Sequence, residues 1–287
     1  MKWSSGHQSP DVIDQRGLRG GGGGGSGALG LLLSIGSKFG LVGILAAVGI
    51  FFVGQRFFGS GGSADATGAQ QAVPGHTTTR DEPAAFVAFV LDDVQDTWTS
   101  EFQSMNRVYP RAKLVLFTDQ VRSACGFASA ASGPFYCPGD QRAYVDLGFY
   151  RELSEKYGAA GDFAQAYVIA HEIGHHVQNV LGIEKRVGND REGADSASVR
   201  LELQADCFSG IWARSTKQRA LLDSGDLEEG LNAAAAIGDD RLQRNAGRSV
   251  NPESFTHGSS EQRVRWFKRG LESGKVEACD TFAARSL

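Results

Sequence analysis

The sequence predicts an α+β fold that is mostly helical, with a small sheet and one transmembrane helix before the folded domain. Three observations support this fold class. Apolar residues recur at spacings of three and four in two long segments, 162–181 and 196–213, as in helices that bury one face. The short apolar run at 114–117 and the segment 142–147 are strand candidates. The run at 29–54 is almost wholly apolar, as a membrane span requires.

The chain divides into four parts by composition. Residues 1–27 contain the unbroken glycine run Gly20–Gly25 and are predicted to form a flexible, Gly-rich cytoplasmic tail. Residues 29–58 are predicted to be a transmembrane anchor. Residues 59–80 are rich in small and polar residues without apolar periodicity, so they are expected to be a linker. Residues 81–287 are then one folded domain of ordinary size.

Positive charge predicts how the anchor is oriented. Only Arg56 closely follows the apolar run, whereas four basic residues precede it: Lys2, Arg16, Arg19 and Lys38. Because positive residues stay in the cytoplasm, the folded domain is expected on the extracytoplasmic side of a single-pass membrane protein. Two alternatives remain. A cleaved signal peptide is one, with Ala64–Ala66 as its cleavage site, and a soluble protein with a buried apolar helix is the other.

The most informative segment is the HExxH pattern of residues 171–175, which lies in the first of the two long helices. Histidines four residues apart share one helix face, so His171 and His175 can reach the same zinc ion. Glu172 points in a neighbouring direction, where it can accept a proton from a zinc-bound water. The pattern also arises by chance as an exposed helix turn. Here the helix is apolar and carries three of the six histidines of the chain.

The same helix has recognisable ends and one internal glycine. Asp162 is the expected N-cap and Gly182 the expected residue at which the helix ends. Gly174 costs helix propensity, about 1 kcal/mol. We therefore expect it to admit another backbone close to the motif.

A second motif, Glu202-Leu203-Gln204-Ala205-Asp206, lies in the next helix, for which Ser196 is a candidate N-cap. Glu202 and Asp206 are four residues apart and share one face. Burying two carboxylates is costly unless a cation lies nearby, and zinc with its histidines supplies one. Glu202 is therefore assigned as third zinc ligand, and Asp206 as the acceptor of an imidazole N–H from His171. The alternative is a solvated acidic face.

These motifs resemble those of gluzincin metallopeptidases, in which HExxH is followed by ExxAD. The chain is more specifically similar to the bacterial neutral zinc metallopeptidases related to YpfJ. The similarity rests on the start Met1-Lys2-Trp3, the Gly-rich segment before one span, the segment Cys125–Pro138, the HEIGHH run and Glu202–Cys207. It implies a zincin-like peptidase domain with one Zn²⁺ per chain, anchored in the bacterial inner membrane.

A further similarity concerns the segment His257–Arg263, which resembles the His…Arg segment that follows the metal helix in integral-membrane gluzincins. The resemblance implies that His257 donates to the developing oxyanion and that Arg263 holds a carboxylate at the site. Those proteins carry proline after the histidine, whereas this chain has Gly258. The alternative is a helix N-terminus with Arg263 on a solvated face.

Four cysteines support an extracytoplasmic domain, since disulfides form outside the cytoplasm. Three pairings are possible. We predict Cys125–Cys137, which closes a local loop, and Cys207–Cys279, which ties the C-terminal region to the second metal helix. The alternative is four buried thiols in a cytosolic protein.

Composition excludes one class of partner, because a net charge of −4 gives no electrostatic basis for binding nucleic acid. The run at 142–147 is either a strand that pairs with an extended substrate, as the gluzincin resemblance implies, or an ordinary sheet strand.

The expected function is a membrane-anchored metalloendopeptidase that hydrolyses peptide or protein substrates through a zinc-activated water, with Glu172 as general base. Two rivals remain. One is a membrane-tethered zinc-containing binding or scaffold module without proteolysis, in which His176 or His257 would close the metal site. The other is a zinc hydrolase of non-peptide substrates.

Overall fold

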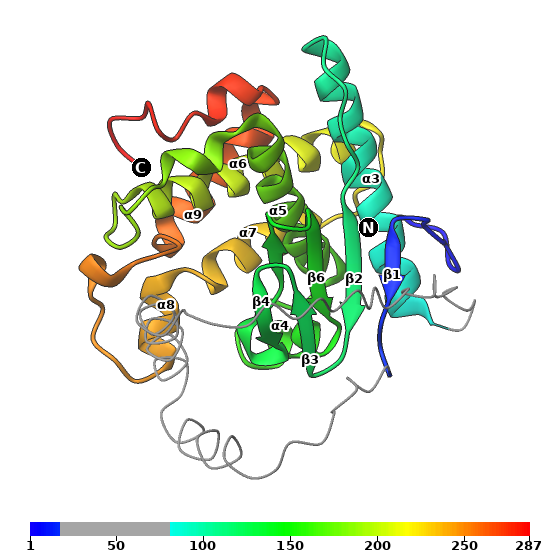
Figure 1. Ribbon diagram of the computed structural model, residues 1–287, viewed down its shortest axis with the longest axis horizontal. Coiled ribbons are helices and arrows are strands. Elements are labelled where there is room, and N and C mark those ends of the chain that lie inside the picture. Colours follow the sequence, from blue (N-terminus) through cyan, green and yellow to red (C-terminus); the bar gives the residue numbers. More distant parts are fainter. Residues whose placement is uncertain (18–80) are drawn as a thin grey trace, which may run out of the picture. The chain divides into compact units, whose positions relative to one another are not determined.

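A four-stranded sheet lies beside a group of helices, and both are built from residues far apart in the sequence (Figure 1). The computed structural model describes residues 1–17 and 81–287. The sheet has the order β1-β2-β6-β5, in which the first three strands are parallel and β5 is antiparallel to β6. The strands are β1 (Val12–Asp14), β2 (Lys113–Phe117), β5 (Phe135–Cys137) and β6 (Arg142–Asp146).

The two faces of the sheet bury different side chains, because successive residues of a strand point to opposite faces. In β2, Leu114 and Leu116 join the large helical core, whereas Val115 joins a smaller cluster on the other face. A two-stranded hairpin contributes to this smaller cluster; its strands are β3 (Gln120–Ser123) and β4 (Gly126–Ser129).

Among the described residues, many more lie in helices than in strands, so the predicted α+β class with a small sheet is confirmed. Of the two that carry the motifs, α5 has the predicted bounds, and α6 begins where predicted but runs past residue 213 to Gln218. Gly182 ends α5 in the left-handed conformation, and the Ser196 side chain caps α6, both as predicted. The helices are α3 (Glu82–Ser104), α4 (Gly148–Glu155), α5 (Asp162–Leu181), α6 (Ala197–Gln218), α7 (Asp226–Ala236), α8 (Asp239–Asn245) and α9 (Ser260–Ser273).

The membrane anchor predicted at 29–58 and the linker predicted at 59–80 lie outside the described residues. Within 1–17 and 81–287, no helix combines the length and apolar character needed to cross a membrane.

The N-terminal residues are part of the folded domain. Strand β1 pairs with β2 in parallel, with Val12 opposite Leu114. The buried Asp11 accepts hydrogen bonds from Arg111 at 2.6 Å and Lys113 at 2.7 Å. The prediction of a flexible tail over 1–27 is therefore wrong for residues 1–17, and residues 18–27 lie outside the described part. A strand of three residues gains its stability from β2, far along the chain, and leaves little local signal.

The N-cap predicted for α5 is also wrong. Gly161 occupies the cap position without a side-chain bond. Asp162, one residue later, instead accepts hydrogen bonds from the Met1 ammonium group at 2.6 and 2.8 Å. Its carboxylate is engaged by another part of the chain, so it does not fold back on its own helix.

Both predicted disulfides are confirmed. Cys125 and Cys137 join with their Cα atoms 5.7 Å apart, and Cys207 and Cys279 join at 5.6 Å. The second bond fastens the C-terminal segment to α6.

Helices α6 and α9 touch through their backbones, because glycine stands at both contact points. A Cβ atom on Gly210 would overlap the carbonyl oxygen of Phe267, and one on Gly270 would overlap that of Cys207. The close approach brings the side chains at the start of α9 up to the motif on α6.

Strand β6 lies in the interior of the sheet. It pairs with β2 on one side and with β5 on the other. Strand β2 pairs with Arg142–Asp146 and β5 pairs with Arg142–Tyr144. The suggestion that residues 142–147 pair with an extended substrate is therefore wrong for 142–144, where both edges of the strand are already paired. Residues 142–146 form the ordinary sheet strand of the alternative interpretation.

Candidate metal centre

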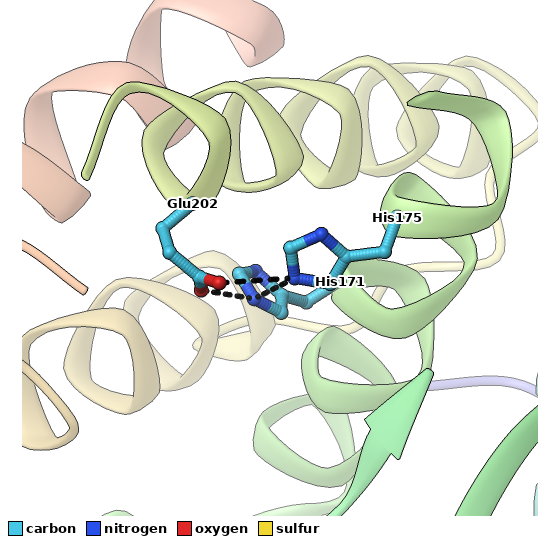
Figure 2. Close-up of side chains that lie close together, drawn as sticks. All are labelled: His171, His175 and Glu202. Carbon is cyan, nitrogen blue, oxygen red and sulfur yellow. Dashed lines mark hydrogen bonds and ion pairs between the residues drawn. The ribbon is translucent and has the colours of Figure 1, made fainter. Parts of the chain in front are cut away.

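Helices α5 and α6 approach closely where the two motifs face each other. A Cβ atom on Gly174 would lie 3.1 Å from the Cα atom of Ala205, a distance tighter than most real contacts. The prediction that Gly174 admits a close approach is thus confirmed. The close approach brings the imidazoles of α5 and the Glu202 carboxylate of α6 together (Figure 2).

Three side chains converge on one point. The Nε2 atoms of His171 and His175 are 3.2 Å apart. Glu202 places one carboxylate oxygen 3.2 Å from Nε2 of His171 and the other 3.5 Å from Nε2 of His175. Figure 2 shows all three pointing inward from the two helices.

These distances fit a zinc ion. Ligand atoms about 2.0–2.1 Å from a tetrahedral zinc lie roughly 3.3–3.4 Å from one another, which matches the three separations above. Two imidazoles and a carboxylate are also a donor set that zinc accepts in hydrolases. The side chains of His175 and Glu202 remain 16% and 17% exposed, so a fourth position can be reached from solvent.

Neighbouring charges shift the pKa values of His171 and Glu202 strongly. Burial disfavours the charged form of His171, but Asp206 and Glu202 outweigh it and raise the pKa of that imidazole to about 9. Burial alone would raise the pKa of Glu202, yet the neighbouring histidines hold it well below its usual range. The two shifts show that the carboxylates and the imidazoles favour each other's charged forms, and a cation bound between them would take the place of the protons on the histidines.

Asp206 lies behind His171, as its spacing from Glu202 predicts. It is fully buried and accepts a hydrogen bond from Nδ1 of His171 at 2.9 Å. A donor at Nδ1 leaves the lone pair of Nε2 facing the ligand cluster.

Arg263 holds the same carboxylate from the other side. Its Nε and Nη2 atoms donate to the two oxygens of Asp206 at 2.9 Å each. The guanidinium is only 2% exposed, so the alternative of a solvated arginine is wrong. The Tyr167 hydroxyl, also buried, donates to Asp206 as well.

His257 lies just before α9. Asp239 fixes its loop, because one carboxylate oxygen accepts from the backbone N–H groups of Thr256 and His257 at 2.7 Å each. Partial burial disfavours the charged imidazole, but Asp239 and Glu202 together raise the pKa of His257. Its side chain is 49% exposed and can therefore turn toward a ligand.

Glu172 is 7% exposed, and burial raises the pKa of its carboxyl against the opposing effect of the two histidines. A carboxylate with a raised pKa is suited to accept and return a proton.

His176 is not available to the cluster. Its Nε2 atom lies 2.7 Å from the carbonyl oxygen of Pro110, and its Nδ1 atom lies 2.9 Å from the hydroxyl of Tyr136. Both ring nitrogens therefore face other partners, and this histidine ties α5 to the strand region.

Sequence reasoning missed three residues that support the cluster: Tyr167, Gln178 and Asp239. Two of them carry a signal, since Tyr167 precedes His171 by four residues and Gln178 follows His175 by three, which places them on the same helix face. Asp239 lies on a different element and carries no such signal.

Comparison with known proteins agrees with this geometry. The model of a family described as "Putative neutral zinc metallopeptidase" matches residues 1–282. The chain belongs to this family. It is 44% identical over 287 residues to the Escherichia coli K12 protein YpfJ, covering 98% of this chain and 99% of YpfJ.

It is also 45% identical over 190 residues to the Mycobacterium bovis protein Mb2605, covering 62% of this chain and 65% of that protein. The protein Rv2575 of Mycobacterium tuberculosis H37Rv matches to the same extent. No solved structure is significantly similar. The family match extends over residues 1–17, which agrees with their place in the folded domain.

Proposed function

We propose that this protein is a zinc-dependent metalloendopeptidase in which His171, His175 and Glu202 hold one Zn²⁺. The observation that carries the proposal is the trio of ligand atoms 3.2–3.5 Å apart, with the buried Glu172 between the two histidines in sequence. Family membership supports the reaction class.

Zinc at this site supplies a Lewis acid that activates water and polarises a substrate carbonyl. Glu172 acts as the general base and then returns the proton to the leaving amine, for which its raised pKa is suited. His257, held by Asp239 and favoured in its charged form, donates to the oxygen that becomes negative in the transition state.

A binding module with a closed zinc site is disfavoured by the surroundings of the cluster. Of the two histidines that could close it, His176 has both ring nitrogens engaged elsewhere, and His257 does not belong to the group of ligand atoms formed by His171, His175 and Glu202. Three protein ligands with solvent access are typical of catalytic rather than structural zinc.

The test is cleavage of a peptide library by the full chain loaded with zinc, beside its Glu172→Gln variant. The full chain is needed because β1 belongs to the sheet. We expect cuts by the parent that the variant does not make, with one zinc bound to each. Zinc binding without cleavage of any peptide would favour the binding module. Cleavage of non-peptide esters or amides, but of no peptide, would favour a non-peptide hydrolase.

For location, we propose a membrane-attached protein whose folded domain lies on the extracytoplasmic side of the bacterial inner membrane. Two disulfides support an oxidising compartment. The apolar run at 29–54 supports attachment to a membrane.

A further inference from the structure

We propose that Gln178 is the positioning residue of His175 and that it sets which nitrogen of this imidazole faces the zinc. This proposal rests on the proposed zinc site and adds a residue to it. Nδ1 of His175 lies 2.8 Å from Oε1 of Gln178, on the side of the ring away from the ligand cluster. Gln178 is 1% exposed, so no water competes for this contact.

The orientation of the Gln178 amide is fixed by backbone carbonyls, which can only accept hydrogen bonds. Its Nε2 atom donates to the carbonyl oxygen of Leu201 at 2.7 Å and to Oε1 of Gln204 at 3.1 Å. Gln204 in turn donates through Nε2 to the carbonyl oxygen of Cys279 at 3.0 Å. We call these hydrogen bonds through Gln178 and Gln204 the relay. It ends at the carbonyl oxygens of Leu201 and Cys279, which only accept, so each amide can have only one orientation.

The relay therefore determines the protonation of His175. With its nitrogen committed to Leu201 and Gln204, Gln178 can offer only its oxygen to the imidazole. Nδ1 of His175 must then be the donor, and Nε2 is left with a free lone pair facing His171 and Glu202. Residues that orient metal-ligating histidines in this way typically contribute about 10- to 100-fold to metal affinity.

The relay also links the metal ligand to the C-terminal segment. Cys279 is held against α6 by its disulfide to Cys207, and this bond places the carbonyl that Gln204 requires. Gln204 therefore contributes to zinc binding through Gln178, with a smaller effect.

The experiment measures zinc affinity by competition with a chelator, for the full chain and three variants. Gln178→Met keeps the volume and removes the acceptor, and we expect its zinc affinity to fall about 10- to 100-fold. The zinc affinity of Gln204→Met should also fall, but by less than that of Gln178→Met. Gln95→Met is the matched control, because Gln95 is equally buried but bonds to Asp11 and Ala112. It should lose stability without losing zinc affinity.

A cobalt-substituted spectrum gives a second readout, since a change in the orientation of His175 shifts the ligand-field bands, whereas a loss of packing elsewhere does not. Equal zinc affinity and an unchanged cobalt spectrum in Gln178→Met would overturn the proposal. A parent protein that binds no zinc would instead overturn the proposed function, so the two failures are distinguishable.

An independent observation leads to a second inference. We infer that residues 1–17 and residues 81–287 lie on the same side of the membrane. A chain that crossed a membrane once between these segments would leave β1 and β2 on opposite sides, where they cannot pair. The sheet requires both, because β1 pairs with β2 over three residues.

Charged contacts join the same two segments. Asp11 accepts from Arg111 and Lys113, and the Met1 ammonium lies 2.6 Å from Asp162. Arg16 donates to Asp81 at 2.6 Å, at the point where the second segment begins. In this N-terminal segment, the Met1 ammonium and Arg16 pair with acidic groups of the domain, and Lys2 donates to the carbonyl oxygen of Ala220. These positive groups therefore have partners in the domain, which weakens their use as a guide to orientation.

The test is labelling of single introduced cysteines with a membrane-impermeant maleimide in spheroplasts that express the full chain. Ser4→Cys reports on the first segment and Ser249→Cys on the second, and both positions are exposed. We expect both to react without lysis. Reaction of one while the other reacts only after lysis would overturn the inference, as would loss of residues 1–17 from the mature protein. Protection of both would support one side but place the domain in the cytoplasm.

Discussion

Replacing Arg263 by methionine should destabilise the protein strongly, because it would remove the guanidinium that donates to both oxygens of the buried Asp206 carboxylate. Arg263 is 2% exposed and Asp206 is fully buried. Breaking such a buried pair by removing one partner typically costs about 3–5 kcal/mol. At roughly 2–4 °C per kcal/mol for a domain of this size, the melting temperature should fall by roughly 6–20 °C.

The assay is thermal unfolding of the metal-free protein, so that zinc binding does not offset the loss. The control is Arg265→Met on the same helix, which removes an exposed pair with Glu261 and one hydrogen bond to the carbonyl oxygen of Leu287. An exposed pair contributes about 0–1 kcal/mol and a hydrogen bond about 1 kcal/mol, so this variant should lose less stability than Arg263→Met.

The combined variant Arg263→Met with Asp206→Asn separates charge from packing. A neutral amide at position 206 needs no cation. The double variant should therefore lose less stability than the sum of the losses in the two single variants. A loss for Arg263→Met as small as that of Arg265→Met would refute the reasoning, and so would full additivity of the pair.

Three further predictions concern affinity and stability. Zinc affinity should rise as the pH increases toward about 9 and then level off, because a proton on His171 competes with the metal below its raised pKa; chelator competition across pH 6–10 measures this, and a flat profile would contradict it. Gly270→Ala should greatly reduce the yield of folded protein, since its Cβ would overlap the Cys207 carbonyl, and normal yield and melting would show that the helices can separate. Replacing Cys207 and Cys279 by serine should cost about 4 kcal/mol for the 72-residue separation, measured by denaturant unfolding. An unchanged unfolding midpoint would show that this disulfide does not stabilise the protein.

The helices and the ligand trio could be predicted from sequence because their signals are local. The spacings of His171 with His175 and of Glu202 with Asp206 are single helix turns, and each motif indicates its own face. The cysteine pairs were also predictable, since the chain has only four cysteines and one pair closes a short loop.

What could not be predicted depends on partners far along the chain. Strand β1 has three residues, precedes a glycine run and is stabilised by β2, so composition pointed to a flexible tail. The central position of β6 depends on β2 and β5, and no feature of residues 142–146 distinguishes an interior strand from an edge strand.

The supports of the two histidines show the same limit. The position of Asp206 behind His171 can be predicted, because a buried carboxylate near zinc is costly unless it has a hydrogen-bond donor or a cation as partner. Gln178 was not predicted, because a neutral amide in a helix carries no such requirement. Its role follows only from the carbonyls of Leu201 and Cys279, which α6 and the disulfide bring to it.

The charges of the buried cluster give a separate reason to expect a divalent cation. Glu172, Glu202 and Asp206 bring three negative charges and Arg263 brings one positive charge, which leaves two negative charges uncompensated. Neutral imidazoles cannot offset them, and burying unpaired charge is costly. The raised pKa of His171 shows the same deficit, since a proton there supplies part of the missing positive charge. A Zn²⁺ ion among the three ligands would balance the cluster while allowing both histidines to be neutral, which is the state that zinc ligation requires.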